Sequence, residues 1–189
     1  MNALIRPQMK ALAPAIAPLG RIPAAPAAPA PPAAIIEGYA CLFGVVDLGR
    51  DLIEQGAFAE SLARRGAAGV RLLYQHDPAE PLGTWLTLRE DARGLFVRGR
   101  LSLGVARARE VAALLADGAI DGLSIGFKAV TARAEPRTRI RRISRIDLWE
   151  ISLVTFPMQP GARVALAAPS DLASAVSEAA RRVRAAARA

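Results

Sequence analysis

Cysteine and histidine are almost absent from this sequence, which has one of each, Cys41 and His76, among 189 residues. A single cysteine excludes a disulfide within the chain. One cysteine and one histidine cannot supply the ligands of a Cys/His zinc site. We therefore expect neither a metal ion nor a cofactor. Cys41 lies in a strand-like run and is interpreted as a small buried residue.

Aromatic residues and long apolar runs are also scarce. Aromatic side chains make up 5% of the sequence, and no basic stripe is interleaved with them, so stacking on nucleic-acid bases has little support. No apolar run approaches the ~18 residues of a membrane-spanning helix. These features argue against a nucleic-acid-binding domain and against insertion into a membrane.

Positive charge is plentiful but unevenly placed. The formal net charge is +8, of which residues 1–34 carry +3 and residues 169–189 carry +2. The segment 35–168 holds 18 basic and 15 acidic residues and is close to balanced. This distribution indicates terminal segments that contact an acidic partner.

Composition divides the chain into three parts. Residues 1–34 contain eight of the 14 prolines, and they predict a disordered arm because such a segment cannot build a core. Residues 35–166 hold the strand and helix patterns of a folded domain. Residues 167–189 form a basic, alanine-rich tail, in which Leu172, Val176 and Val183 are spaced as on one face of a helix.

Strand patterns outnumber helix patterns in the folded part. Alternation of apolar and polar residues predicts strands over 35–44, 70–76, 83–89, 94–101, 124–134 and 139–156. Helical spacing predicts a short helix near 58–62 and a longer one over 106–117, and turn residues predict a loop over 45–56. The sequence therefore predicts a mainly β fold with helices, of the α+β class.

Ser124 lies between two glycines in the string DGLSIGF, at the start of a predicted strand. Glycines at these positions remove Cβ atoms that would hinder an approaching substrate backbone. The string matches G-x-S-x-G, but the nucleophile elbow of α/β-hydrolases needs a strand followed by a helix, with the histidine after the serine. Here a helix precedes the strand and His76 lies upstream. The α/β-hydrolase interpretation is rejected, and Ser124 is either an exposed nucleophile or a serine that merely opens a strand.

Two other residues suit such a nucleophile. His76, at the end of a predicted strand, is the one imidazole that could act as its base. Glu150 lies in a strand that is apolar on both alternations, and a buried carboxylate needs a partner. From the residues alone, an arginine could supply that partner, or a bulge could turn Glu150 outward.

Five strings occur in a fixed order along the chain. They are EGYA, VVDLGRDLIEQGAF, LLYQHDPAEPLGTW around His76, DGLSIGF around Ser124, and DLWEISLVTFPMQPGARV around Glu150. Together they resemble the prohead (capsid maturation) serine proteases of tailed phages of the Hong Kong 97 type and of gene transfer agents. The resemblance covers about residues 35–166.

This resemblance implies the fold of the herpesvirus assemblins, a small, mostly antiparallel β-barrel ringed by helices. It implies Ser124 as the nucleophile and His76 as the general base and acid. The herpesvirus relatives use a second histidine as the third member, and this chain has none. Glu150 matches the acidic position of the phage family, and Asp77 and Asp147 are the alternatives.

The implied activity is that of a serine endopeptidase inside the assembling prohead, in the cytoplasm of a bacterial host. The implied substrates are the scaffold-like arm of the major capsid protein, the portal protein, and the tails of the protease itself. Backbone amides near Ile125 and Gly126 are candidates for the oxyanion hole. The alternative is a catalytically inactive scaffold that organises coat subunits, and the choice between a monomer and a homo-oligomer stays open.

Overall fold

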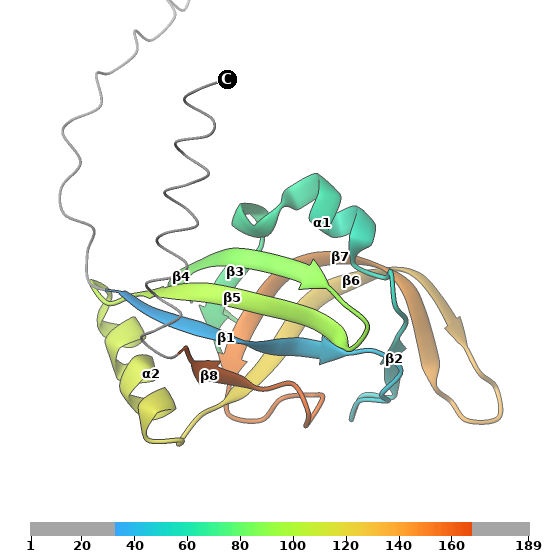
Figure 1. The fold of residues 1–189 in the computed structure, drawn as a ribbon. Helices are drawn as coiled ribbons and strands as arrows, with labels where there is room; N and C mark the ends of the chain where they lie inside the picture. Colours follow the sequence, from blue (N-terminus) through green and yellow to red (C-terminus); the bar gives the residue numbers. More distant parts are fainter. Residues whose placement is uncertain (1–32, 168–189) are drawn as a thin grey trace, which may run out of the picture. The chain divides into compact units, whose positions relative to one another are not determined.

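A curled, eight-stranded sheet forms most of the structure (Figure 1). This computed structural model describes residues 33–167, so the predicted arm over 1–34 and tail over 167–189 lie almost entirely outside the described residues. The helical elements are α1 (Ala59–Arg65), the 3-10 helix η1 (Ala67–Gly69) and α2 (Ala106–Ala116). The strands are β1 (Ala33–Leu42), β2 (Asp51–Ile53), β3 (Arg71–Tyr74), β4 (Asp77–Glu90), β5 (Gly94–Ser102), β6 (Gly122–Ala134), β7 (Arg141–Val154) and β8 (Val164–Leu166).

Strand β7 organises the sheet because it has three partners. It pairs antiparallel with β6 over its whole length, and parallel with β2 and then β3 along its other edge. Antiparallel pairing continues the order as β3-β4-β5-β1-β8. Just before β8, the Ala162 carbonyl accepts from Leu123 N of β6, and the Arg163 carbonyl accepts from Tyr39 N of β1. This link bridges the two edges of the curled sheet.

The sheet curls around a core of branched apolar side chains. Alternate residues of β5, Leu95, Val97 and Leu101, are completely buried, as strand periodicity requires. Burying a side chain of this size contributes roughly 1.5–3 kcal/mol to stability. The same core holds β6 and β7 in register through fully buried side chains, which are Leu123, Leu148, Ile151 and Leu153.

The boundaries of β3 and β4 differ from the sequence prediction. β3 ends at Tyr74 rather than at His76, and β4 begins at Asp77 rather than at Gly83. The added part of β4 contains Pro78 and Pro81, and its ladder with β3 shifts register twice. Proline has no amide to donate, and irregular pairing is where a strand tolerates it. Elsewhere, β1 begins two residues before 35, and β2 lies inside the predicted loop over 45–56.

Both predicted helices are present, as α1 and α2. α1 lies against β7, where the Leu148 amide donates to Ser61 Oγ at 2.9 Å. The prediction of a mainly β fold with helices is confirmed. No helix in the described part of the chain is long and apolar enough to cross a membrane.

Candidate active site

His76 lies in the two-residue turn that joins β3 to β4. The φ angles of Gln75 and His76 are 52° and 62°, so both residues adopt the left-handed conformation of a tight hairpin turn. This conformation is costly for residues other than glycine, on the order of 1–3 kcal/mol each, and it persists where surrounding contacts enforce it. The turn therefore presents the His76 ring in a fixed position.

Residues at the end of β7 supply the contacts that hold this turn. The Gln75 amide donates to the Leu153 carbonyl at 2.9 Å, and Gln75 Nε2 donates to Thr155 Oγ1 at 2.7 Å. The His76 amide donates to Ser152 Oγ at 3.1 Å. The position of the imidazole thus depends on a strand that lies far along the sequence.

Glu150 contacts the ring of His76 directly. The distance between Glu150 Oε1 and His76 Nδ1 is 2.6 Å, and the two side chains are 13% and 44% exposed. The hydrogen bond that the His76 ring donates to Glu150 raises the pKa of His76 above 6.5, and the negative charge of the carboxylate adds to this, while partial burial opposes it. An ionised carboxylate on Nδ1 fixes the proton there and leaves Nε2 free to accept one.

Glu150 meets the requirement for a partner inferred from the sequence, although its strand is not buried on both faces throughout. Trp149 is 50% exposed, whereas the segment 151–154 is buried. Glu150 lies at the border between these two parts. Its second oxygen, Oε2, accepts from Ser152 Oγ at 2.6 Å, so both carboxylate oxygens are hydrogen-bonded.

Ser124 lies in β6, directly opposite Ser152 of β7. Contrary to the expectation of an exposed hydroxyl, Ser124 is only 6% exposed. The flanking glycines face protein rather than an approaching substrate. A Cβ on Gly122 would lie 2.5 Å from the Val154 carbonyl oxygen, and one on Gly126 would lie 2.0 Å from Glu150 Oε1. Both glycines are therefore required for β6 to pack against β7.

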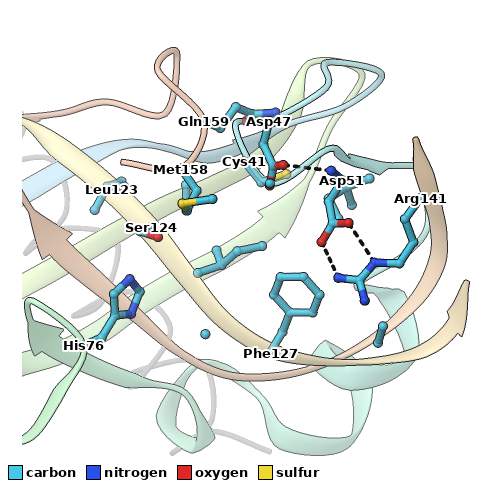
Figure 2. Close-up of a pocket in the computed structure, with 16 residues that line it drawn as sticks. Cys41, Asp47, Asp51, His76, Leu123, Ser124, Phe127, Arg141, Met158 and Gln159 are labelled. Atoms are coloured by element: carbon cyan, nitrogen blue, oxygen red, sulfur yellow. Dashed lines mark hydrogen bonds and ion pairs between the residues drawn. The ribbon is translucent and has the colours of Figure 1, made fainter. Parts of the chain in front are cut away.

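Ser124 and His76 line the same pocket, of about 450 Å³ (Figure 2). The Ser124 hydroxyl makes no hydrogen bond to any residue in the described range, and none joins it to His76. Both groups lie at the same end of the pocket, away from Asp51 and Arg141, without a hydrogen bond between them (Figure 2). Catalytic hydrogen bonds are often long before a substrate is bound, so this separation is compatible with a serine–histidine pair.

The rest of the pocket combines an apolar wall with an anionic end. Its wall includes Leu123, Ile125 and Phe127 of β6. At the far end, Arg141 Nε donates to Asp51 Oδ1 at 2.7 Å (Figure 2). Asp47 lies beside this pair, and burial raises the pKa of its carboxyl group. The sequence analysis assigns no site role to Asp47 and Asp51, because they lie in the predicted loop over 45–56, where acidic residues are expected to be solvated.

Cys41 also lines the pocket but is not suited to act as a nucleophile. Burial raises the pKa of its thiol to about 12, so the thiol stays protonated at neutral pH. Among residues 33–167, no group of three or more His, Cys, Asp and Glu side chains is placed to hold a metal ion.

Neither alternative carboxylate contacts His76. Asp147 Oδ2 accepts from Arg65 Nη2 at 2.9 Å and from Trp149 Nε1 at 2.8 Å, and its Oδ1 also contacts Arg64. The hydrogen bond from Trp149 and the neighbouring arginines lower the pKa of Asp147. Asp77 Oδ1 accepts from the Ala79 amide at 2.8 Å, at the start of β4. Both carboxylates have other partners.

Strand register distinguishes the two candidate oxyanion donors. The Leu123 amide donates to the Ala162 carbonyl, away from β7. Backbone groups alternate along a strand, so the Ile125 amide points to the same edge of β6 and the Gly126 amide points toward β7. Beyond the bridge at Gly122, that edge has no strand partner in the described structure. Of the two, Ile125 therefore offers the free amide.

Sequence reasoning missed Ser152 and Gln75. Ser152 follows Glu150 by two residues, so it lies on the same face of β7, and a fully buried hydroxyl there needed an explanation. That alternation was a usable signal. Gln75 carried no such signal, because neither its residue type nor its neighbours indicate a left-handed turn.

Comparison with known proteins shows which family this chain resembles in sequence. Residues 28–175 match the family model described as Caudovirus prohead serine protease. The prohead protease of Enterobacteria phage HK97 is 36% identical over 133 residues, which are 69% of this chain and 59% of that protein. The aligned part thus spans somewhat more than half of the length of this relative.

Two solved structures are also similar. The capsid assembly protease of bacteriophage T4 matches with a TM-score of 0.50 and 14% identity, over 64% of this chain and 80% of that one. At this identity the match supports the fold alone. The protease of Kaposi's sarcoma-associated herpesvirus matches with a TM-score of 0.49 and 14% identity, over 84% of this chain and 78% of that one.

Proposed function

Since this chain belongs to the Caudovirus prohead serine protease family, we propose that it is a serine endopeptidase that cleaves capsid assembly proteins during prohead maturation. The observation that carries the proposal is the contact of 2.6 Å between Glu150 Oε1 and His76 Nδ1, beside a pocket whose wall contains Ser124. This arrangement has the three groups that a serine nucleophile needs.

In the proposed mechanism, Ser124 Oγ attacks the carbonyl carbon of the scissile peptide bond. Nε2 of His76 accepts the proton of the hydroxyl and later gives it to the leaving amine. Glu150 holds the Nδ1–H tautomer and stabilises the imidazolium. The amide of Ile125 donates to the oxyanion that forms on the carbonyl oxygen. Substrate binding brings Ser124 Oγ and Nε2 within hydrogen-bond distance.

The open edge of β6 suits a polypeptide substrate. An extended peptide can add to an unpaired strand edge through backbone hydrogen bonds, and alternate side chains then enter neighbouring pockets. The pocket beside Ser124 lies along this edge and has apolar and anionic parts. These features support a peptide bound in extended form across Ser124.

The proposed substrates are the scaffold-like arm of the major capsid protein, the portal protein and the protease's own terminal segments. The excess positive charge of those segments, +3 over residues 1–34 and +2 over residues 169–189, supports contact with an acidic partner inside the prohead. The proposed location is the assembling prohead in the host cytoplasm.

Co-expression with the major capsid protein tests this function. The wild-type enzyme should generate new protein termini, detected by mass spectrometry, and Ser124→Ala should generate none. A fluorophosphonate probe should label the wild-type serine and leave Ser124→Ala unlabelled. If the wild-type protein neither reacts with the probe nor trims the capsid protein, a catalytically inactive scaffold is the better description.

A further inference from the structure

Ser152 contacts both residues that would activate the nucleophile. It lies in β7, and its side chain is completely buried. Its Oγ donates to Glu150 Oε2 at 2.6 Å and accepts from the His76 amide at 3.1 Å. One hydroxyl group therefore links the carboxylate to the backbone of the histidine turn.

The bond to Glu150 determines where the carboxylate points. The Ser152 hydroxyl has a single proton, and this proton is committed to Oε2. With Oε2 held, Oε1 is directed at Nδ1 of His76. Hydrogen bonds to a charged acceptor are among the strong ones in proteins, and the donor Ser152 is completely buried.

The hydrogen bond from the His76 amide to Ser152 Oγ fixes the position of the His76 backbone, and therefore of the Cβ atom from which the ring extends. His76 is a left-handed residue other than glycine, with φ of 62°, and its backbone needs external contacts to remain in this conformation. The amide finds its acceptor in Ser152 Oγ. The hydroxyl thereby fixes the distance between the backbone of His76 and the carboxylate that its ring must reach.

Ser152 is not itself suited to be a nucleophile. It lies directly opposite Ser124 in the β6–β7 ladder, but only Ser124 lines the pocket. The proton of Ser152 is directed to Glu150 rather than to an imidazole nitrogen. The two serines have the same side chain and face each other, yet their surroundings assign them different tasks.

We propose that Ser152 is a positioning residue. Its hydroxyl holds both the Glu150 carboxylate and the backbone of the His76 turn, so that Glu150 Oε1 contacts His76 Nδ1. The kinetic part of this inference rests on the proposed protease function, whereas its geometric part does not. Without the hydroxyl, Glu150 can rotate away and the turn loses an acceptor. The contact between Glu150 and His76 then loosens.

The ionisation of His76 provides a direct readout. His76 is the single histidine of the chain, so one imidazole signal in an NMR titration reports on this contact without assignment work. In Ser152→Ala, the pKa of His76 should fall toward 6.5. For the same variant we expect a decrease in kcat on the order of 10- to 100-fold, with KM little changed, because a misplacement of the base weakens the chemical step.

Ser61→Ala is a matched control. Ser61 is also a buried serine, 1% exposed, and its Oγ also accepts from a backbone amide, that of Leu148 in β7 at 2.9 Å. It contacts none of the site residues. Ser61→Ala should lower the melting temperature but leave the pKa of His76 and kcat at their wild-type values. If Ser152→Ala also changes only the melting temperature, the proposal is overturned.

If Ser152→Ala yields no folded protein, Ser152→Cys decides the question. The thiol is a weaker donor of similar shape, so the pKa of His76 should fall part of the way, and a wild-type pKa would overturn the proposal. The titration needs no substrate. It therefore still tests the role of Ser152 if cleavage by the wild-type enzyme cannot be shown, and a failure of the protease function remains distinguishable.

Discussion

Gly126 and Glu150 face each other across the β6–β7 ladder, and the carboxylate of Glu150 occupies the space that a side chain at position 126 would need. This explains why the second glycine of the string around Ser124 is a glycine. Its role is to let a neighbouring strand deliver a carboxylate to His76.

Gly126→Ala should therefore separate Glu150 from His76. A methyl group at this position would lie 2.0 Å from Oε1, so the carboxylate must move. We expect activity to fall on the order of 100-fold and the pKa of His76 to fall toward 6.5. Gly104→Ala is the control, since a Cβ there would meet nothing within 4 Å. Wild-type kinetics in Gly126→Ala would contradict this account.

Ser124→Ala should abolish cleavage while the fold stays intact. The hydroxyl has no hydrogen-bond partner in the described structure, so its removal leaves no buried group unpaired. The melting temperature should remain close to that of the wild type. Processing of the capsid protein, followed by mass spectrometry, should cease. Residual processing at the wild-type rate would exclude a serine mechanism at this position.

The activity should depend on the ionisation of His76. Only the neutral ring can accept the serine proton, so kcat/KM should fall as the pH drops through a pKa above 6.5. The free energy of unfolding should depend on pH in the opposite direction from kcat/KM. The imidazolium–carboxylate pair stabilises the fold fully below pH 6.5, and this stabilisation is lost as the pH rises through the folded pKa. A profile of kcat/KM that is flat from pH 5 to 8 would argue against His76 as the base.

Glu150→Gln should reduce turnover by roughly 10²- to 10⁴-fold per folded molecule, less than Ser124→Ala does. The amide keeps the shape of the side chain, but it removes the charge that stabilises the imidazolium and allows the wrong tautomer. The acid limb of kcat/KM should shift toward 6.5. Activity must be normalised to the folded fraction, which a thermal melt gives. Full specific activity in a destabilised variant would remove Glu150 from the site.

Asp147→Asn should affect stability rather than catalysis. Asp147 accepts from Arg64, Arg65 and Trp149 on the surface formed by α1 and β7, and it does not contact His76. The melting temperature should decrease, more at low salt than at high salt, and kcat should be unchanged. A loss of kcat comparable to that in Glu150→Gln would restore Asp147 as a candidate for the third member.

The sequence indicates candidate residues for the site but not how they are arranged. Ser124, His76 and Glu150 are candidates because of their residue types, their neighbours and a family resemblance. The alternation of apolar residues predicts the strands that carry Ser124 and Glu150, whereas His76 lies in a turn. The left-handed turn at Gln75 and His76 could not be foreseen, since turns of this kind usually contain glycine or asparagine. The parallel pairing of β3 with β7 is equally invisible, because it joins segments whose local patterns are unrelated.

Ser152 and Gly126 illustrate a further limit. Each was visible in the sequence, but its task depends on which residue lies across the ladder, and that is set by register rather than by composition. A serine in an apolar strand and a glycine beside a nucleophile both have several explanations until the opposite strand is known.

Because β3 pairs with β7, the candidate site can form only after β7 has been synthesised. The ribosome makes the turn with His76 and the strand with Ser124 well before it makes the residues that hold them, since the amide of His76 and its acceptor in Ser152 are 76 positions apart. Closing so large a loop is a late and slow event in folding. A nascent chain that lacks its last long strand thus contains a serine and a histidine but no working site. Under the proposed function, cleavage can therefore begin only after β7 has been made and has paired with β3.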